Sequence, residues 1–288
     1  MDYAFIVLIE VLRAISWLVL LASGLAIIFG MMRVINIAHG EFLMLGGYTV
    51  ILATGAGVPL AISILVLAPL VVGVFGVLVE RLVIRFLYGR MIDTLLATWG
   101  LGLFMVGSVT LIFGNTREGV STPLGGFSVG AYQVSTYTLV LIAASAALLA
   151  AIWAVLKFTR AGLIARAVMQ NPGMAQALGV NSRLVYMVTF GIGSALTGLA
   201  GGLLAPVTGV VPSMGVNFIG QSFITVIVGG ASVITGTISA AGSLGAVSQS
   251  VTFGWGPVYG DAALLLAALV LLRLLPQGIT GRIFTRSI

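Results

Sequence analysis

The chain has 288 residues, of which 60% are hydrophobic and only 7% are charged. A water-soluble domain carries about 25% charged residues, so this chain lacks the polar surface of a soluble fold and lipid must surround most of it. Its net charge of +6 does not indicate nucleic-acid binding, because the basic residues stand at the ends of apolar runs. The chain has no Cys, which excludes disulfides and thiolate metal sites. It has a single His, so few side chains are suited to catalysis.

Apolar segments recur along the whole chain, and a membrane-spanning helix needs about 20 such residues. We therefore predict an all-α, polytopic membrane protein with about eight membrane segments, some of them short or broken. These segments are residues 5–30, 41–56, 59–80, 94–114, 137–156, 184–205, 220–248 and 258–275.

The basic residues indicate which loops are cytoplasmic. They gather in three clusters: Arg81, Arg85 and Arg90; Lys157, Arg160, Arg166 and Arg183; and Arg273, Arg282 and Arg286. The polar segments 115–136, 206–219 and 254–261 have no such clusters and are predicted to face outside. Counting back from the first cluster places the N-terminus outside.

Asn36, His39 and Glu41 lie between the first two apolar segments, and ionisable residues near a membrane are costly and usually functional. Three interpretations are open: a hydrogen-bonded break in a helix, part of a solute path or gate, and a proton relay or catalytic pair. A nucleophilic enzyme lacks a nearby Ser, and a metal site lacks further ligands. At a helix break, Asn36 and His39 can form hydrogen bonds with the freed backbone groups. Glu41 would lie in the first turn of the following helix, where its negative charge interacts favourably with the helix dipole.

Asp93 is placed to cap the N-terminus of segment 94–114. Thr98 and Trp99 follow about a turn and a half into that helix. A Trp near the membrane interface is typical of an aromatic belt, and a position lining the solute path is the alternative for this pair.

Segment 158–183 is cytoplasmic by its charge, yet it has the pattern of two short amphipathic helices. The apolar face of the first helix is formed by Leu163, Ile164, Ala167 and Val168. Asn171-Pro172 breaks it, and a second helix with Met174, Ala177 and Leu178 ends at Gly179. Such helices dock on the membrane surface, on the chain's own helices, or in a groove of a partner protein.

Two later segments carry unusual patterns of small residues. Ser194, Gly198 and Gly202 form a stripe that predicts a close helix–helix contact. Segment 220–248 is too short for two full helices, and its centre at 229–236 has turn chemistry. It predicts a pair of short or broken helices that dips toward the cytoplasm, with one long kinked helix as the alternative.

The single Lys residue, Lys157, is not part of a phosphate-binding loop. The chain therefore cannot bind ATP by that route, and any ATP-driven step requires another chain.

Several motifs resemble those of a known family, over nearly the whole chain. With them the chain resembles the LivH-type permeases of the hydrophobic amino acid uptake family of ABC importers. Its Leu95–Gly100 and Arg166–Asn171 variants are similar to the urea and short-chain amide branch of that family. The motifs are Ile28–Gly30, Arg33–Phe42, Gly46–Tyr48, Leu95–Gly100, Arg166–Asn171, Ala177–Asn181 and Pro276–Gly278.

The resemblance implies that residues 1–288 form one permease domain in the bacterial inner membrane. Its cargo would be a small polar solute, either a branched-chain amino acid or urea or a short-chain amide. The implied partners are a homologous second permease or a second copy, two ATPase subunits that bind ATP and Mg, a periplasmic solute-binding protein and membrane lipid, but no nucleic acid. The chain itself would bind no cofactor and would not be an enzyme.

The resemblance also identifies segment 158–183 as the coupling segment that docks on the ATPase. The candidate coupling residues are Gly162, Leu163, Arg166, Ala167, Gln170, Asn171, Ala175, Leu178 and Gly179. The candidates for the translocation path or gate are Asn36, His39, Glu41, Thr98 and Trp99.

The alternative function is a stand-alone secondary transporter or channel, which requires embedded charges for coupling. Glu41 and Glu80 are the candidates for that role. An intramembrane enzyme is disfavoured by the shortage of His and of paired carboxylates, and no catalytic or metal-binding residue is assigned.

Overall fold

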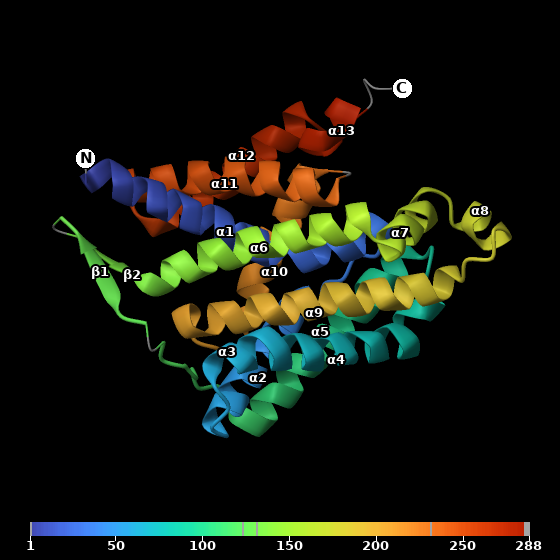
Figure 1. The fold of residues 1–288 in the computed structure, drawn as a ribbon, viewed down its shortest axis with the longest axis horizontal. Helices are drawn as coiled ribbons and strands as arrows, with labels where there is room; N and C mark the ends of the chain where they lie inside the picture. The colour runs from blue at the N-terminus through green and yellow to red at the C-terminus, as the bar shows by residue number, and fades with distance from the viewer. Residues whose placement is uncertain (1, 123, 131, 231, 285–288) are drawn as a thin grey trace. The chain divides into compact units, whose positions relative to one another are not determined.

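A computed structural model describes residues 2–122, 124–130, 132–230 and 232–284 of the chain (Figure 1). Almost all of its regular structure is helical, which confirms the all-α prediction. The elements are α1 Asp2–Met32, α2 His39–Gly55, α3 Leu60–Ile62, the π-helical turn η1 Ser63–Leu67, α4 Ala68–Leu82, the 3₁₀ turn η2 Ile84–Phe86, α5 Met91–Phe113, β1 Gly126–Val129, β2 Tyr132–Ser135, α6 Thr136–Phe158, α7 Arg160–Gln170, α8 Pro172–Ala177, α9 Ser182–Thr208, α10 Met214–Gly229, α11 Val233–Trp255, α12 Pro257–Leu274 and α13 Gly278–Phe284.

Six helical stretches of the described chain are long and apolar enough to cross a membrane, so the protein is polytopic. They are Phe5–Met32, Leu60–Phe86, Met91–Phe113, Thr136–Phe158, Ser182–Thr208 and Pro257–Gly281. The remaining two predicted segments are helical as well. One is α2, a short helix of 17 residues, and the other is the pair formed by α10 and α11.

The break between α10 and α11 confirms the broken-helix prediction for segment 220–248. The two helices are bent by 115° to each other, and Ala231, which the sequence placed in the turn, lies outside the described residues. The predicted bounds were too narrow, because α10 begins at Met214 and α11 continues to Trp255. The expected outside loop 206–219 is correspondingly reduced to residues 209–213 between two helices.

One local prediction is corrected, and one short element was not predicted. Helix α5 begins at Met91, so Asp93 lies in its first turn and pairs with Arg90 instead of capping the helix. Segment 115–136 contains a short hairpin, β1–β2, in which Phe127 pairs with Val134. Its Gly- and Ser-rich composition gave no strand pattern, and strands of four residues carry too little periodicity to detect.

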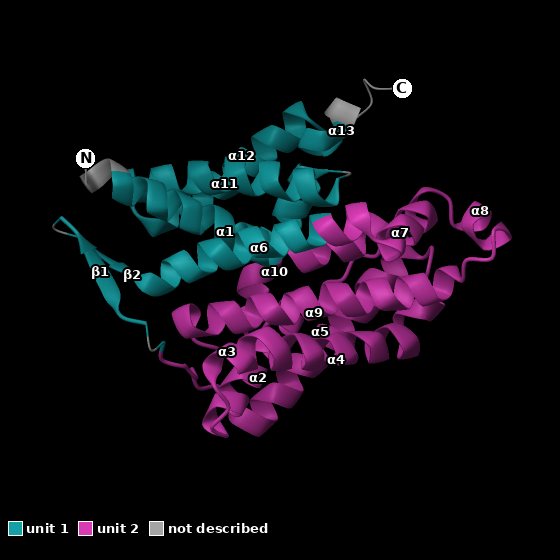
Figure 2. Cartoon of the chain, viewed as in Figure 1, with its two compact units in different colours: residues 1–22, 122–153, 221–288 teal, residues 23–121, 154–220 magenta. Residues whose placement is uncertain are grey.

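The chain forms two compact units, which Figure 2 colours separately. Unit 1 comprises residues 1–22, 122–153 and 221–288, and unit 2 comprises residues 23–121 and 154–220. Each unit has its own apolar core.

The core of unit 2 is built on close contacts of α9 with α2 and α4. Phe42 lies edge-on to Phe75 and Phe190, with ring centroids 5.4 and 6.3 Å away. The predicted small-residue stripe on α9 is confirmed, because a Cβ atom on Gly46 would overlap the backbone of Gly198. A Cβ on Gly201 would likewise overlap the Leu43 carbonyl oxygen. The helices thus touch backbone to backbone, as small residues allow in membranes.

In unit 1, apolar side chains of α1, α10, α11 and α12 form a separate core. Its other feature is α13, which lies against the α10–α11 break. The Thr280 hydroxyl donates to the Gly229 carbonyl oxygen at 2.6 Å and accepts the Ser232 N–H at 3.3 Å. A single side chain therefore satisfies backbone groups on both sides of the break, where lipid would satisfy none.

Replacing Gly201 with Leu should destabilise unit 2, because the new side chain meets backbone atoms that cannot rotate away. Overpacking of this kind costs about 1–3 kcal/mol or more. The melting temperature of the detergent-solubilised protein, followed by size-exclusion chromatography, should fall. Gly107→Leu is the control, because Gly107 has open space around its Cβ position. Equal melting temperatures for both variants would contradict the backbone contact.

Thr280→Val should weaken unit 1, because it leaves the Gly229 carbonyl and the Ser232 N–H without their partner. A buried unsatisfied group costs about 1–3 kcal/mol. Thr280→Ser keeps the hydroxyl and should melt within a few degrees of the wild type, whereas Thr280→Val should melt lower in the same assay. The bridging role is wrong if valine is tolerated as well as serine.

Candidate functional site

The predicted coupling segment, residues 158–183, contains two short helices, α7 and α8, as the sequence predicts. The Thr159 hydroxyl caps α7 by accepting the Gly162 N–H at 3.0 Å, and the Asn171 side chain caps α8 by accepting the Met174 N–H at 3.0 Å. Gly179, with φ of +87°, ends α8 in the left-handed conformation. These caps define two short helices with a sharp turn at Asn171-Pro172.

Most of the apolar side chains of this segment are not covered by the chain. Leu163 is 61% exposed, Met174 61% and Leu178 78%, and Ile164 and Met169 are also exposed. Val168 is buried instead, so only part of the predicted apolar face of α7 packs within unit 2. The polar candidates Arg166, Gln170 and Asn171, together with Ala167 and Gly179, share the exposed surface.

Two of the candidate coupling residues are buried. Gly162 lies in the first turn of α7, where a Cβ atom would overlap the Val155 carbonyl oxygen at the end of α6. Ala175 is 3% exposed. These two residues therefore position the helices and are not on the surface that a partner would contact.

The predicted path residues lie around the connection between α1 and α2 in unit 2. Helix α1 ends at Met32, and Arg33 adopts a positive φ of 52°. The next residues, 34–38, are non-helical or a turn, and Asn36 and His39 are fully buried. Helix α2 begins at His39 and has Glu41 in its first turn, as predicted.

Thr98 of α5 satisfies the backbone of this connection. Its hydroxyl accepts the Ile37 N–H at 3.1 Å and lies 3.3 Å from the Ile35 carbonyl oxygen. The prediction that Asn36 provides this hydrogen bonding is wrong, because neither amide atom of Asn36 has a partner in the described chain. Thr98 was considered only as a residue that lines the solute path, and its contact with this backbone was not predicted.

His39 and Glu41 contact residues that sequence reasoning did not assign to the site. The His39 Nδ1 lies 3.3 Å from the Thr197 hydroxyl, which itself donates to the Gly193 carbonyl oxygen at 2.8 Å. Glu41 lies beside Gly215, since a Cβ atom added to Gly215 would be 2.8 Å from a Glu41 carboxylate oxygen. The small-residue stripe on α9 was the only sequence signal near Thr197.

Trp99 does not join this group. It is 55% exposed, whereas Thr98 is fully buried, because neighbouring residues of a helix point in directions about 100° apart. The structure therefore places Asn36, His39, Glu41 and Thr98 around one connection and Trp99 on the outer face of unit 2.

Glu80, the other buried carboxylate, accepts a hydrogen bond from the Tyr88 hydroxyl. Burial, together with Glu80, raises the pKa of Tyr88 above its usual range, so Tyr88 remains a hydrogen-bond donor. Tyr88 also lies against Tyr186, with ring centroids 5.0 Å apart. Glu80 thus has a structural partner that joins the end of α4 to the following loop.

Comparison with known proteins agrees with these features. The family model described as branched-chain amino acid transport system / permease component matches residues 7–275. A Methanocaldococcus jannaschii protein named as a probable branched-chain amino acid transport permease LivH is 30% identical, over 92% of this chain and 88% of the relative. BraD of Pseudomonas aeruginosa, a high-affinity branched-chain amino acid transport permease, is 27% identical, over 91% of each chain.

A solved structure, PsaBC from Streptococcus pneumoniae in complex with Fab, shares the fold. Its TM-score is 0.50 at 15% sequence identity, with 97% of this chain and 94% of that chain covered. The family match spans the membrane helices, the α1–α2 connection and the coupling segment. The chain thus belongs to the family of branched-chain amino acid transport permeases and is a multi-pass inner-membrane permease subunit of an ABC importer.

Proposed function

We propose that this permease carries a branched-chain amino acid and that α7 and α8 transmit the work of two ATPase subunits to its membrane helices. The names of the curated relatives support this cargo over urea or a short-chain amide. A periplasmic binding protein would deliver the amino acid, and a homologous permease or a second copy would complete the path. ATP and Mg would bind the ATPase subunits, and this chain would hold no cofactor.

The observation that carries the coupling proposal is the exposed apolar surface of α7 and α8. Leu163, Met174 and Leu178 are well exposed on short, capped helices. Apolar side chains that remain in water do not stabilise the protein. Burial of these side chains in a groove of a partner would stabilise the complex by the hydrophobic free energy of each side chain. Arg166, exposed on the same helix, adds a charge that can orient the partner.

The α1–α2 connection would shape the inner end of the path without proton chemistry. Two of its hydrogen-bonding residues are Thr98 and Thr197, whose neutral hydroxyls do not titrate. Of the two carboxylates that a secondary transporter would need, Glu80 has the Tyr88 hydroxyl as a hydrogen-bond partner. That contact supports a structural role for Glu80 and not a role in ion coupling.

Coupling can be tested by truncating the exposed apolar side chains. Leu163→Ala and Leu178→Ala should each lower amino acid uptake about tenfold, since a docking anchor contributes about 1–2 kcal/mol or more. The amount of permease in the membrane should not change, because neither side chain is buried in the chain itself. Co-purification of the ATPase and uptake into proteoliposomes measure the effect.

The control for this experiment is Leu265→Ala, which truncates an exposed leucine of α12 outside the coupling segment. It should retain both the ATPase and the uptake. Full ATPase binding and full uptake in the Leu163 and Leu178 variants would show that α7 and α8 do not dock.

The role of His39 can be tested with two substitutions. His39→Gln keeps a hydrogen-bonding group near the Thr197 hydroxyl and should be tolerated, whereas His39→Leu should impair expression or transport. Uptake by the wild type should not follow a titration near pH 6.5 when measured from about pH 5 to 8. A proton-coupled mechanism requires the opposite: Gln as damaging as Leu, at normal membrane expression, and a pH-dependent wild type.

A further inference from the structure

Unit 1 contains a cavity of about 290 Å³ between α1, α10, α11 and α12. Its volume is close to the lower end of the range for small-molecule sites, about 300 Å³. The residues that line it include Arg13, Trp17, Gln221, Gln249, Asp261 and Leu264. A cavity with charged groups inside a chain that is only 7% charged requires an explanation, because such groups are costly in a membrane.

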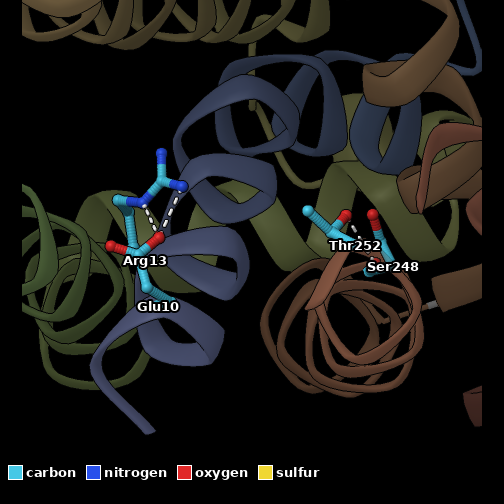
Figure 3. Close-up of polar contacts among 4 residues, drawn as sticks. All are labelled: Glu10, Arg13, Ser248 and Thr252. Carbon is cyan, nitrogen blue, oxygen red and sulfur yellow. Dashed lines mark hydrogen bonds and ion pairs between the residues drawn. The ribbon is translucent and has the colours of Figure 1, made fainter. Parts of the chain in front are cut away.

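The positive group of the cavity is Arg13. Its guanidinium contacts one carboxylate oxygen of Glu10, from Nε at 2.7 Å and from Nη2 at 2.6 Å. Figure 3 shows this pair on α1, with Ser248 and Thr252 on the neighbouring α11. A guanidinium has five N–H groups, so the Nη1 group remains for a second acceptor, and Arg13 has no further partner in the described chain.

The amide of Gln249 also lines the cavity. Gln249 is only 9% exposed, so the cavity is the place where its side chain can meet a ligand or water. An amide both donates and accepts hydrogen bonds, and it can therefore serve either kind of group on a ligand. Gln221 nearby accepts the Trp17 indole N–H at 3.3 Å through its oxygen, which leaves its amide N–H groups available.

Asp261 provides the negative group. It lies in the first turns of α12, is exposed, and forms no ion pair with any residue of the described ranges. The same cavity has an apolar part formed by Ala14, Leu18, Pro257 and Leu264. One cavity thus combines a guanidinium, a carboxylate, two amides and an aliphatic surface.

We propose that this cavity binds the transported solute as a zwitterionic aliphatic amino acid. The carboxylate contacts Arg13, the ammonium group contacts Asp261, and the side chain lies on the apolar surface. Gln249 donates to or accepts from the amino acid between these ends. The site rests on the proposed function, and it adds a specific binding place within one permease chain.

The position of the cavity fits a site on the outer side of the membrane. Its α11 and α12 residues lie near the connection at Gly256, which the charge distribution places outside the membrane. A neutral amide such as urea would need only the glutamines and would leave both charges unused. The pairing of opposite charges across one cavity therefore favours an amino acid as the ligand.

The proposal is tested on the complete importer, purified with its ATPase subunits and partner permease, in detergent and without the binding protein. The probes are radiolabelled leucine, 4-methylpentanoate, which lacks the ammonium group, and acetamide. Asp261→Asn should weaken leucine binding by about tenfold or more, as expected for loss of a charge-assisted contact. It should not weaken binding of 4-methylpentanoate, because that ligand has no group for Asp261.

Gln249→Leu tests the buried amide independently, and it should weaken leucine binding several-fold. The matched controls are Ser250→Ala, at an exposed neighbouring position, and Asp93→Asn, a carboxylate of unit 2 that pairs with Arg90. Both controls should bind leucine as the wild type does.

Three outcomes would overturn the site. One is wild-type leucine affinity in both Asp261→Asn and Gln249→Leu, and another is equal weakening of leucine and 4-methylpentanoate by Asp261→Asn. The third is binding of acetamide but not of leucine to the wild type. If the importer still takes up leucine and retains its ATPase subunits when one of these outcomes is observed, only the proposed binding site is wrong and the proposed function stands. A wild-type complex that neither retains the ATPase nor imports leucine would overturn the proposed function as well.

Discussion

The structure depends on one constraint: inside a membrane no water is available to pair with free backbone N–H and C=O groups. Continuous helices meet this constraint by themselves, and they make up most of the chain. The breaks are the exceptions, and two of them are closed by neutral hydroxyls. Thr98 serves the connection between α1 and α2, and Thr280 serves the break between α10 and α11. Non-helical backbone can therefore exist in this protein without charged residues.

Close contact between helices is a second consequence of the lipid environment. Lipid is as apolar as the side chains, so association between helices relies on packing and not on the hydrophobic effect. Gly46 and Gly201 let α2 and α9 meet at the backbone. Helix α9 begins shortly after α8, where the Asn181 side chain caps it. About four turns later, α9 carries Thr197 beside His39. One continuous helix thus leads from α8, next to the exposed apolar side chains, to the α1–α2 connection within unit 2.

Much of this could be predicted from the sequence, because hydropathy and basic residues report directly on membrane segments. The coupling helices were predicted for a local reason: Asn171-Pro172 and Gly179 act within their own turns. The break at 229–236 was found in the same way. Contacts between distant segments could not be predicted, since Thr98, Thr197 and Gly215 are ordinary residues of apolar helices until the fold brings them beside Ile37, His39 and Glu41. Asn36 shows the same limit, because its polarity suggested a role that Thr98 performs.

The position of Thr280 has a consequence for the order in which the protein is made. Its partners, Gly229 and Ser232, precede it by 51 and 48 residues. A ribosome adds about 5–20 residues per second, so Gly229 and Ser232 are synthesised seconds before Thr280. Until Thr280 is in place, the bend between α10 and α11 lacks the hydroxyl that pairs with the backbone groups on its two sides. The closing hydrogen bonds of this bend therefore form late in the synthesis of unit 1.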